Sequence, residues 1–255
     1  MEKQIKVTYL AHSGFLVETE RHDLLFDYST GKLPGLASGG PPSSGKPFYV
    51  FVSHSHGDHF NPEIFRLPEI FPQVFYVLSD DVVRKPGYRE NRKNLAPERI
   101  LSVKPDQSYD LADLRITTLR STDAGVAFLV ETEGITVYHA GDLNWWFWKE
   151  ESRQWNNDMT ARYQKELEKM RDVPIDLAFL PLDPRQEEYY YLGFESMLKA
   201  AKVRYAVPMH MWGVYSLARK LREDGHLDGT GTNVLEVTGN GQEITLSLPD
   251  LPIPS

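Results

Sequence analysis

A dense group of potential metal ligands directly follows an apolar segment of this chain. Residues 54 to 59 read His-Ser-His-Gly-Asp-His, and they come after residues 48–52, which read Phe-Tyr-Val-Phe-Val. Crowding three imidazoles and a carboxylate costs free energy unless a positive charge lies among them. Zinc and similar divalent ions bind nitrogen and oxygen ligands of this type. The segment therefore predicts a metal site at the end of a buried strand; the alternative is a polar surface turn rich in histidine.

The spacing of these ligands indicates two neighbouring metal positions. His54 and His56 are two residues apart, so their side chains point the same way in an extended segment. Asp58 and His59 are adjacent, and in a turn they diverge from that pair. Residues 61–63, Asn-Pro-Glu, are typical of a helix start. We therefore expect the two histidines to serve one metal position and the Asp-His pair to serve the other.

The six-residue motif resembles the signature of the metallo-β-lactamase superfamily, which is His-x-His-x-Asp-His after a strand. Two later segments agree with this resemblance. Asp142 follows an apolar run where the family places a metal-bridging aspartate, and His210 ends another run where the family places its last histidine ligand. Residues 8–15 and 24–27 are similar to the opening β-hairpin of the same fold.

The resemblance covers roughly residues 5–248, and it implies an α/β fold, a four-layer αββα sandwich, in a single domain over residues 1–255. The short segments His-x-Gly-Asp and Pro-x-His look closest to the L-ascorbate-6-phosphate lactonase-like hydrolases, and N-acyl-phosphatidylethanolamine phospholipase D is a more distant relative. Two insertions are expected. Residues 31–47 form either a solvated connection or a mobile rim over the site. The Trp-rich and charged helical segment 143–172 either packs as core or lid, or forms a substrate-facing wall or subunit contact.

One departure from the family pattern concerns the first metal position. The family usually has another histidine between the motif and the bridging aspartate, whereas residues 119–125 contain none. Asp123 lies in this stretch as the candidate replacement; the alternative is a turn aspartate. We expect one or two divalent ions, zinc or manganese, with the second position better formed. The resemblance implies His54, His56, Asp142 and the candidate Asp123 for the first position, and Asp58, His59, His210 and Asp142 for the second.

Five further residues are candidates for binding substrate or for holding the ligands. His12 either lines the site or is a structural histidine. Asp27 ends an apolar strand and either orients a ligand histidine or forms a turn. His139 is expected to support the bridging aspartate rather than to bind metal. Asp183 and Arg185 follow an apolar strand and either bind substrate or belong to a solvated surface turn.

Composition agrees with a cytoplasmic enzyme. The chain has 255 residues, no cysteine and a net charge of −8. Disulfides, thiolate ligands and a cysteine nucleophile are therefore excluded. The acidic balance opposes binding to nucleic-acid phosphates, although a small anionic substrate remains compatible with a metal site. No segment reaches the roughly 18 apolar residues of a membrane span, and the charged N-terminus does not look like a signal peptide. The sequence leaves a homo-oligomer open.

Short apolar runs alternate with helical patterns along the chain, which by itself indicates a mixed α/β domain. The predicted strands are 5–10, 14–19, 23–27, 48–53, 74–78, 100–103, 113–119, 126–132, 135–139, 175–180, 204–208 and 243–248. The predicted helices are 62–67, 80–84, about 157–171, 194–202 and 214–223.

These features predict a metal-dependent hydrolase in which a metal-activated water attacks a small ester, lactone or phosphoester. Asp58 is the predicted catalytic residue, because it can bind metal and also orient the water or receive its proton. A serine elbow, a P-loop and a dinucleotide fingerprint are missing from the sequence. Two alternatives stay open: a phosphodiesterase or nuclease, and a degenerate family member that binds a ligand without turnover.

Overall fold

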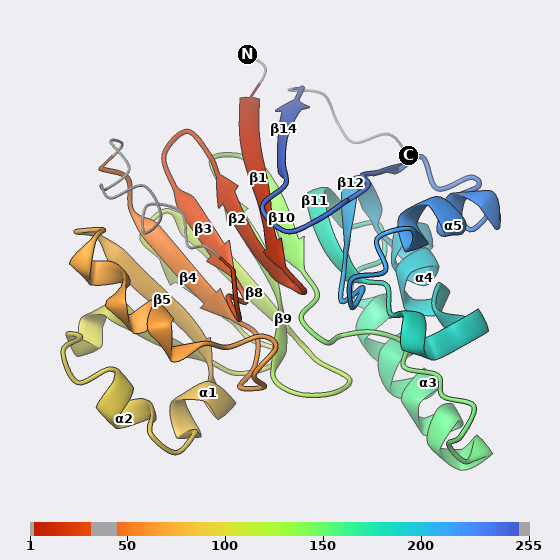
Figure 1. Ribbon diagram of the computed structural model, residues 1–255, viewed down its shortest axis with the longest axis horizontal. Helices are drawn as coiled ribbons and strands as arrows, with labels where there is room; N and C mark the ends of the chain where they lie inside the picture. Colours follow the sequence, from red (N-terminus) through yellow and green to blue (C-terminus); the bar gives the residue numbers. More distant parts are fainter. Residues whose placement is uncertain (1–2, 32–44, 250–255) are drawn as a thin grey trace. The chain divides into compact units, whose positions relative to one another are not determined.

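The computed structural model of the protein describes residues 3–31 and 45–249 (Figure 1). Most of the predicted loop insertion, residues 32–44, therefore lies outside the described residues. The described chain divides into two compact units. Among the described residues, unit 1 contains those up to Lys104 and residues 239–249, and unit 2 comprises Pro105–Thr238. The single-domain organisation stays a prediction.

Unit 1 is built on a seven-stranded mixed sheet with the order β14-β1-β2-β3-β4-β5-β6. The strands β14, β1, β2 and β3 pair antiparallel, and β3, β4, β5 and β6 pair parallel. Every residue of β3 and β4 is buried, as expected for parallel strands inside a sheet. The strands are β1 (Lys3–Ala11), β2 (Gly14–Glu18), β3 (Asp23–Phe26), β4 (Phe48–Val52), β5 (Val74–Ser79), β6 (Ile100–Val103) and β14 (Glu243–Leu248).

Short helices connect the parallel strands of unit 1. Asn61 caps the first of them, because its side-chain oxygen accepts a hydrogen bond of 3.0 Å from the backbone N–H of Glu63. Ile64 and Phe65 from this helix and Val82 from the next pack into the same apolar cluster as β4 and β5. The helical segments are η1 (Pro62–Glu69), α1 (Asp80–Arg84), α2 (Tyr88–Asn91) and η2 (Pro97–Arg99).

Unit 2 is built on a second seven-stranded mixed sheet, with the order β13-β12-β11-β10-β9-β8-β7. The strands β7, β8, β9 and β10 pair antiparallel in sequence order, and β10, β11, β12 and β13 pair parallel. Glu133 and Gly134 make one tight turn with φ of 52° and 67°, as two-residue hairpins require. The strands are β7 (Ser108–Leu111), β8 (Leu114–Arg120), β9 (Val126–Thr132), β10 (Ile135–His139), β11 (Pro174–Pro181), β12 (Lys202–Met209) and β13 (Asn233–Val234).

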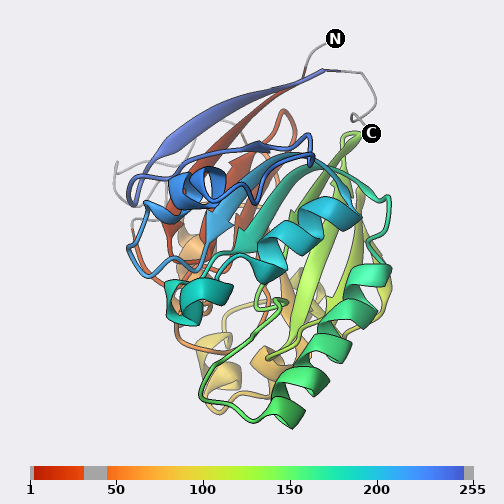
Figure 2. The same ribbon diagram turned by 90° about the vertical axis from the view of Figure 1, so that its right-hand side faces the viewer.

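The helices of unit 2 lie in the connections that parallel strands need. Helix α4 contacts β11 and β12, and α3 lies beside α4 (Figure 2). The first turn of α3 is capped by Ser152, whose hydroxyl accepts from the backbone N–H of Trp155 at 3.1 Å. The helical segments are α3 (Arg153–Glu168), η3 (Pro184–Tyr189), α4 (Leu192–Ala200) and α5 (Leu217–Glu223). Among the helices of the described ranges, none is long and apolar enough to cross a membrane.

Each strand predicted from the sequence is present, with ends that differ by a few residues at most. The sequence missed β7, whose residues alternate between exposed and half-buried, and β13, which is only two residues long. Helix α3 begins at Arg153 rather than near residue 157, because the Ser152 cap lies further upstream than the apolar pattern suggested. Of the insertion predicted at 143–172, residues 143–152 are therefore not helical.

Candidate metal centre

The histidine motif forms the loop that follows β4 in unit 1. His54 and His59 are fully buried, Asp58 is half-buried and His56 is exposed. One ligand nitrogen each of His54 and His56 lie within 4.8 Å of one another. The ligand atoms of His12, Asp58 and His59 lie within the same distance of one another. The two pairs expected from the spacing of the motif are both present in unit 1, with His12 beside the second, but His54 and His59 also have ligand atoms within 4.8 Å of one another. The division into two metal positions stays a prediction.

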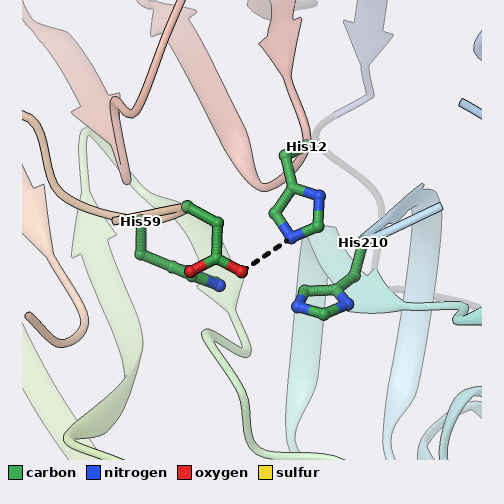
Figure 3. Close-up of side chains that lie close together, drawn as sticks. His12, His59 and His210 are labelled. Atoms are coloured by element: carbon green, nitrogen blue, oxygen red, sulfur yellow. Dashed lines mark ion pairs between the residues drawn. The ribbon is translucent and has the colours of Figure 1, made fainter. Parts of the chain in front are cut away.

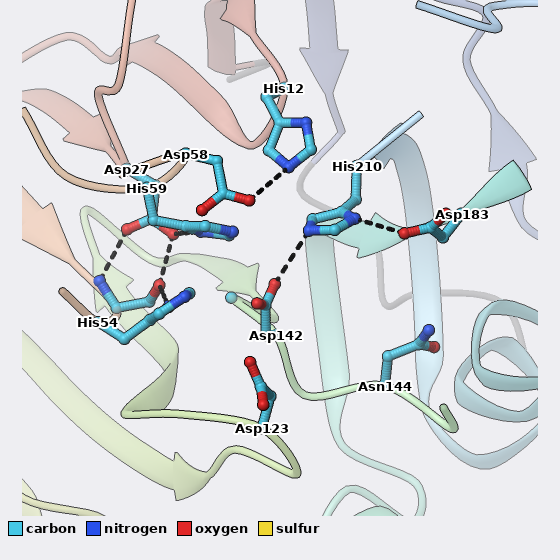
Figure 4. A network of polar contacts seen from close by, with 12 residues as sticks. His12, Asp27, His54, Asp58, His59, Asp123, Asp142, Asn144, Asp183 and His210 are labelled. Carbon is cyan, nitrogen blue, oxygen red and sulfur yellow. Dashed lines mark hydrogen bonds and ion pairs between the residues drawn. The ribbon is translucent and has the colours of Figure 1, made fainter. Parts of the chain in front are cut away.

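Asp27 anchors this loop from the end of β3 (Figure 4). Its Oδ2 atom lies 2.7 Å from Nδ1 of His59, and its Oδ1 atom accepts from the backbone N–H of Ser53 at 2.7 Å. The Ser53 hydroxyl donates to Asp27 at 2.5 Å and lies 2.9 Å from Nδ1 of His54. Because a carboxylate only accepts hydrogen bonds, Nδ1 of His59 carries its proton and Nε2 keeps a lone pair. Of the two interpretations of Asp27, the structure agrees with the one in which it orients a histidine.

His12 contacts Asp58 in unit 1. Nε2 of His12 lies 3.4 Å from Oδ2 of Asp58, which is the dashed contact in Figure 3. The hydrogen bond with His12 is the largest influence on Asp58, and it holds the pKa of that carboxyl well below its usual range despite partial burial. Asp58 is therefore ionised at neutral pH. His12 has a φ of 53°, a strained conformation of the kind that gathers at functional sites.

Helix α1 fixes the middle of the loop through residues that sequence reasoning missed. Oδ2 of Asp81 accepts from the backbone N–H of Ser55 at 2.8 Å, and the Lys85 ammonium donates to the backbone carbonyl of Ser55. The same ammonium lies 5.4 Å from the centre of the Phe60 ring. In the sequence, the acidic residues that open α1 look like ordinary charges at a helix N-terminus, so they gave no signal of this contact.

The donors of unit 2 follow the ends of neighbouring parallel strands. Asp142 comes after β10 and His210 directly after β12. Because β10, β11 and β12 pair in parallel, their carboxyl ends meet at one edge of the sheet. Nε2 of His210 lies 3.5 Å from Oδ1 of Asp142, and Nδ1 lies 2.8 Å from Oδ2 of Asp183 (Figure 4). Asp183 therefore holds His210 with Nε2 turned toward Asp142.

The surface-turn interpretation of Asp183 is wrong. Its side chain is fully buried, although that of Arg185 is 50 % exposed. Burial raises the pKa of Asp183, but hydrogen bonds from His210 and Arg185 outweigh this effect and lower it to about 2. Trp212 adds a donor at 3.2 Å from Oδ2. The sequence could not separate the two interpretations, because an exposed Asp-x-Arg pair and a buried one have the same sequence.

Asp123 lies in the loop between β8 and β9 with an exposed side chain. One of its carboxylate oxygens lies within 4.8 Å of an oxygen of Asp142. Two carboxylates this close repel one another unless a proton or a cation lies nearby. The Ser121 hydroxyl accepts from the backbone N–H of Asp123 at 3.1 Å, so Ser121 makes the turn contact in this loop. Whether Asp123 binds metal stays a prediction.

His139 and Thr122 shape the turn that carries Asp142. His139 is fully buried, and its Nδ1 accepts from the backbone N–H of Gly141 at 3.1 Å. The Thr122 hydroxyl contacts the backbone carbonyls of Asp142 at 3.2 Å and Asn144 at 2.6 Å. This arrangement agrees with a supporting role for His139. The sequence gives no signal of this role for Thr122, because a threonine in a loop carries no distinctive pattern.

The aromatic segment after Asp142 packs within unit 2. The indole N–H of Trp146 donates to the Asp142 carbonyl at 3.0 Å, and its ring is stacked on Trp148 with centroids 5.9 Å apart. The same ring lies 5.5 Å from the ring of His210. Trp146 is only 6 % exposed. Trp146 therefore agrees with core packing rather than with a substrate-facing wall or a subunit contact, and its ring packs against the candidate ligand His210.

Residues 6–157, more than half of the chain, match the family model described as "Beta-lactamase superfamily domain". The chain belongs to the beta-lactamase superfamily. The matched residues contain the histidine motif and Asp142.

Relatives and solved structures agree with this membership. The UPF0173 metal-dependent hydrolase of Archaeoglobus fulgidus is 27 % identical over 86 % of this chain and 88 % of that protein. That of Thermococcus kodakarensis is 26 % identical over 95 % and 100 %. The metallo hydrolase Igni18 from Ignicoccus hospitalis has a TM-score of 0.63 at 15 % identity, covering 95 % of this chain and 98 % of that one. YhfI from Bacillus subtilis, described as a metallo-beta-lactamase fold protein, has a TM-score of 0.61 at 18 % identity, with 95 % and 99 % covered.

These likenesses confirm the α/β metallo-β-lactamase fold, the αββα sandwich that the sequence predicted. The protein is a hydrolase of the superfamily. The resemblance to the superfamily is confirmed. The relatives named above are UPF0173 metal-dependent hydrolases, and they do not identify the lactonase-like branch.

The donor set of each unit fits a divalent metal ion. Imidazole nitrogens and carboxylate oxygens are the ligands that zinc and manganese take in proteins. In both units a buried carboxylate holds Nδ1 of a histidine, His59 in one and His210 in the other. This arrangement fixes the tautomer and ring orientation that a metal-binding histidine needs.

Proposed function

We propose that this superfamily member is a metal-dependent hydrolase whose donors in unit 1 and unit 2 together bind one or two divalent cations, zinc or manganese. His54, His56, Asp142 and Asp123 would serve the first position, and Asp58, His59, His210 and Asp142 the second. The observation that carries the proposal is the repeated carboxylate–histidine pair, Asp27 with His59 and Asp183 with His210. A carboxylate that accepts the ring N–H of a histidine raises the basicity of that ligand. The chain contains two such pairs, at places far apart in the sequence.

A bound divalent cation lowers the pKa of water and polarises an oxygen that gains charge in the reaction. The residues of the chain supply the remaining steps. Asp58 is ionised and held by His12, so it can orient the attacking water and accept its proton. Asp27 and Asp183 keep the histidines in one tautomer while charge develops. Trp146 excludes water from one side of His210.

The proposed substrate is a small ester, lactone or phosphoester, and the lactonase-like branch is one source of that expectation. The net charge of −8 argues against a nucleic-acid substrate. A cytoplasmic location, no membrane partner and an open oligomeric state complete the proposal. A nuclease and a binding protein without turnover are the competing outcomes of its test.

The test is elemental analysis of gently purified protein, followed by a panel of lactones, carboxylic esters, phosphomonoesters, small phosphodiesters and nucleic acids. We expect one or two equivalents of metal and turnover of at least one small ester, lactone or phosphoester. The matched controls are Asp58→Asn, which keeps the shape of the side chain, and the chelated wild-type protein. Turnover of nucleic acid alone would favour the nuclease, and bound metal without any turnover would favour the binding protein.

A further inference from the structure

Trp212 has a strained backbone conformation two residues after the candidate ligand His210. The backbone N–H of Val214 donates to the carbonyl of Met211 at 2.9 Å, so Trp212 and Gly213 are the central residues of a tight turn. Their φ angles are 50° and 81°. Turns with positive φ at both central positions favour Asn and Gly, and a bulky residue there is strained by about 1 kcal/mol or more.

The Trp212 side chain is also half exposed to water. It is 50 % exposed, and the neighbouring Val214 is 41 % exposed. A half-exposed tryptophan gives up a large part of the free energy that burial of its ring would contribute. Strain and exposure combined indicate that the turn is kept to present this ring rather than to stabilise the fold.

Arg185 lies against this ring as a rigid cation. Its guanidinium carbon is 4.5 Å from the centre of the Trp212 ring and 5.8 Å from that of Trp148. Its Nε and Nη2 atoms donate to the Asp183 carboxylate at 3.0 Å and 2.6 Å. These contacts hold the guanidinium in one geometry while the side chain stays 50 % exposed. A group fixed in this way loses little conformational entropy when it binds an anion.

We propose that Arg185 and Trp212 select the substrate, and that the substrate class is an aromatic anion. Arg185 binds a carboxylate or phosphate group, and the Trp212 ring packs against a flat apolar part of the same molecule. Asp183 links this surface to the metal centre, because it contacts Arg185, Trp212 and His210 at once. The inference rests on the proposed hydrolase function and names the chemistry of its substrate.

The test measures binding of anions that the enzyme does not hydrolyse, using the metal-loaded protein and isothermal titration calorimetry. Benzoate and phenylphosphonate are compared with acetate and methylphosphonate. We expect the aromatic anions to bind about tenfold more tightly, since aromatic contacts contribute on this scale. Equal affinities for the aromatic and aliphatic anions would overturn the proposal.

Two substitutions of Trp212 separate recognition from structure. Trp212→Asn suits the positive φ, so the melting temperature should not fall and the metal content should stay unchanged while the preference for aromatic anions disappears. Trp212→Phe keeps a ring but loses the hydrogen bond to Asp183, so it should retain part of that preference. Loss of metal in Trp212→Asn, with the preference unchanged per metal-loaded molecule, would show that Trp212 acts through Asp183 and would overturn the proposal.

Arg185→Met should weaken both kinds of anion about tenfold, and Arg185→Lys should recover part of the loss. The matched control is Arg99→Met, because Arg99 lies 4.9 Å from the Phe75 ring in unit 1 and makes a similar cation–ring contact away from the candidate ligands. Unchanged anion affinity in Arg185→Met would overturn the inference. Hydrolysis without selective anion binding would defeat this inference alone, whereas selective binding without hydrolysis would defeat the proposed function alone.

Discussion

The two units supply metal donors in opposite ways. Unit 1 places its candidate ligands in one loop of six residues, and unit 2 brings Asp142 and His210 together from the ends of separate strands. Both nevertheless use a buried aspartate to hold Nδ1 of a histidine, at 2.7 Å in unit 1 and 2.8 Å in unit 2. The shared device suggests that histidine orientation is the common requirement, and that the chain can meet it with either local or distant residues.

The aspartates that hold these histidines have different surroundings. Asp27 accepts from Ser53, which in turn contacts His54, so one carboxylate supports two candidate ligands. Asp183 supports one candidate ligand and is balanced by Arg185. In unit 1 one aspartate therefore supports two candidate ligands, whereas in unit 2 the supporting aspartate is connected through Arg185 to an exposed surface.

The largest effect should come from Asp142, the only residue assigned to both metal positions. Asp142→Ala should lower turnover by on the order of 1,000-fold and weaken metal binding at both positions, because each loses a charged ligand. Steady-state kinetics and metal titration measure the two effects. Near-normal turnover would remove Asp142 from the site and leave unit 2 with His210 and the candidate Asp123.

The next comparison concerns single histidines from each unit. His59→Ala and His210→Ala should lose more metal than His54→Ala, because the second position has four candidate ligands, whereas the first has three unless Asp123 contributes. Elemental analysis after identical purification and dialysis gives the stoichiometry of each variant. Equal loss in all three would mean one shared site in place of two positions.

The supporting aspartates should have smaller effects of unequal size. Asp27→Asn should lower metal affinity toward the upper end of an expected 10- to 100-fold range, and Asp183→Asn toward the lower end. The reason is that Asp27 supports both His54 and His59, whereas Asp183 supports only His210. Competition with a chromophoric chelator measures the affinities. A larger loss in Asp183→Asn would reverse the ranking of the two devices.

Asp123 should have a modest effect on the first metal alone. Asp123→Asn keeps the length of the side chain and the backbone contact to Ser121 but removes the charge. We expect the weaker metal equivalent to lose affinity about fivefold, while the tighter one is unchanged. Ser121→Ala is the matched control for the loop. Unchanged binding of both equivalents in Asp123→Asn would leave the turn interpretation of Asp123.

The smallest expected effect is on the free energy of unfolding, and it concerns Asp23, a buried aspartate of unit 1 that, unlike Asp27, holds no candidate ligand. Burial raises the pKa of Asp23 to about 6, with Lys46 only 4.0 Å away as a partial compensation. Because the folded state then binds more protons than the unfolded state, wild-type stability falls as pH rises from about 4 to 6. Asp23→Asn should therefore be more stable by about 2 kcal/mol at most above pH 6 and show no such gain below pH 4.

Urea unfolding across this pH range measures the difference for Asp23→Asn. The variant should keep its full metal content, since Asp23 lies at the opposite end of β3 from Asp27. A gain that persists below pH 4 would mean that Asp23 acts through packing rather than through its charge.

The sequence by itself predicted the strands and the histidine motif because these signals are local. Apolar runs such as Phe48–Val52 become buried strands wherever they pair, and the ligands of the motif are adjacent in the chain. Only the two edge strands of unit 2 escaped prediction among the described strands, because β7 is at most half-buried and β13 is two residues long. Asp142 and His210 were found only through a family resemblance, because nothing near them in the sequence reveals a partner.

Only the tertiary structure decided what the supporting residues do. Asp27, Asp81 and Asp183 each follow a strand or open a helix, and such an aspartate in a sequence is equally a turn, a cap or a ligand support. Pairing of β3 with β4 brings Asp27 to the histidine loop, and pairing of β11 with β12 brings Asp183 to His210. The physical reason is that hydrogen bonds between residues distant in sequence depend on strand register, which no local pattern contains.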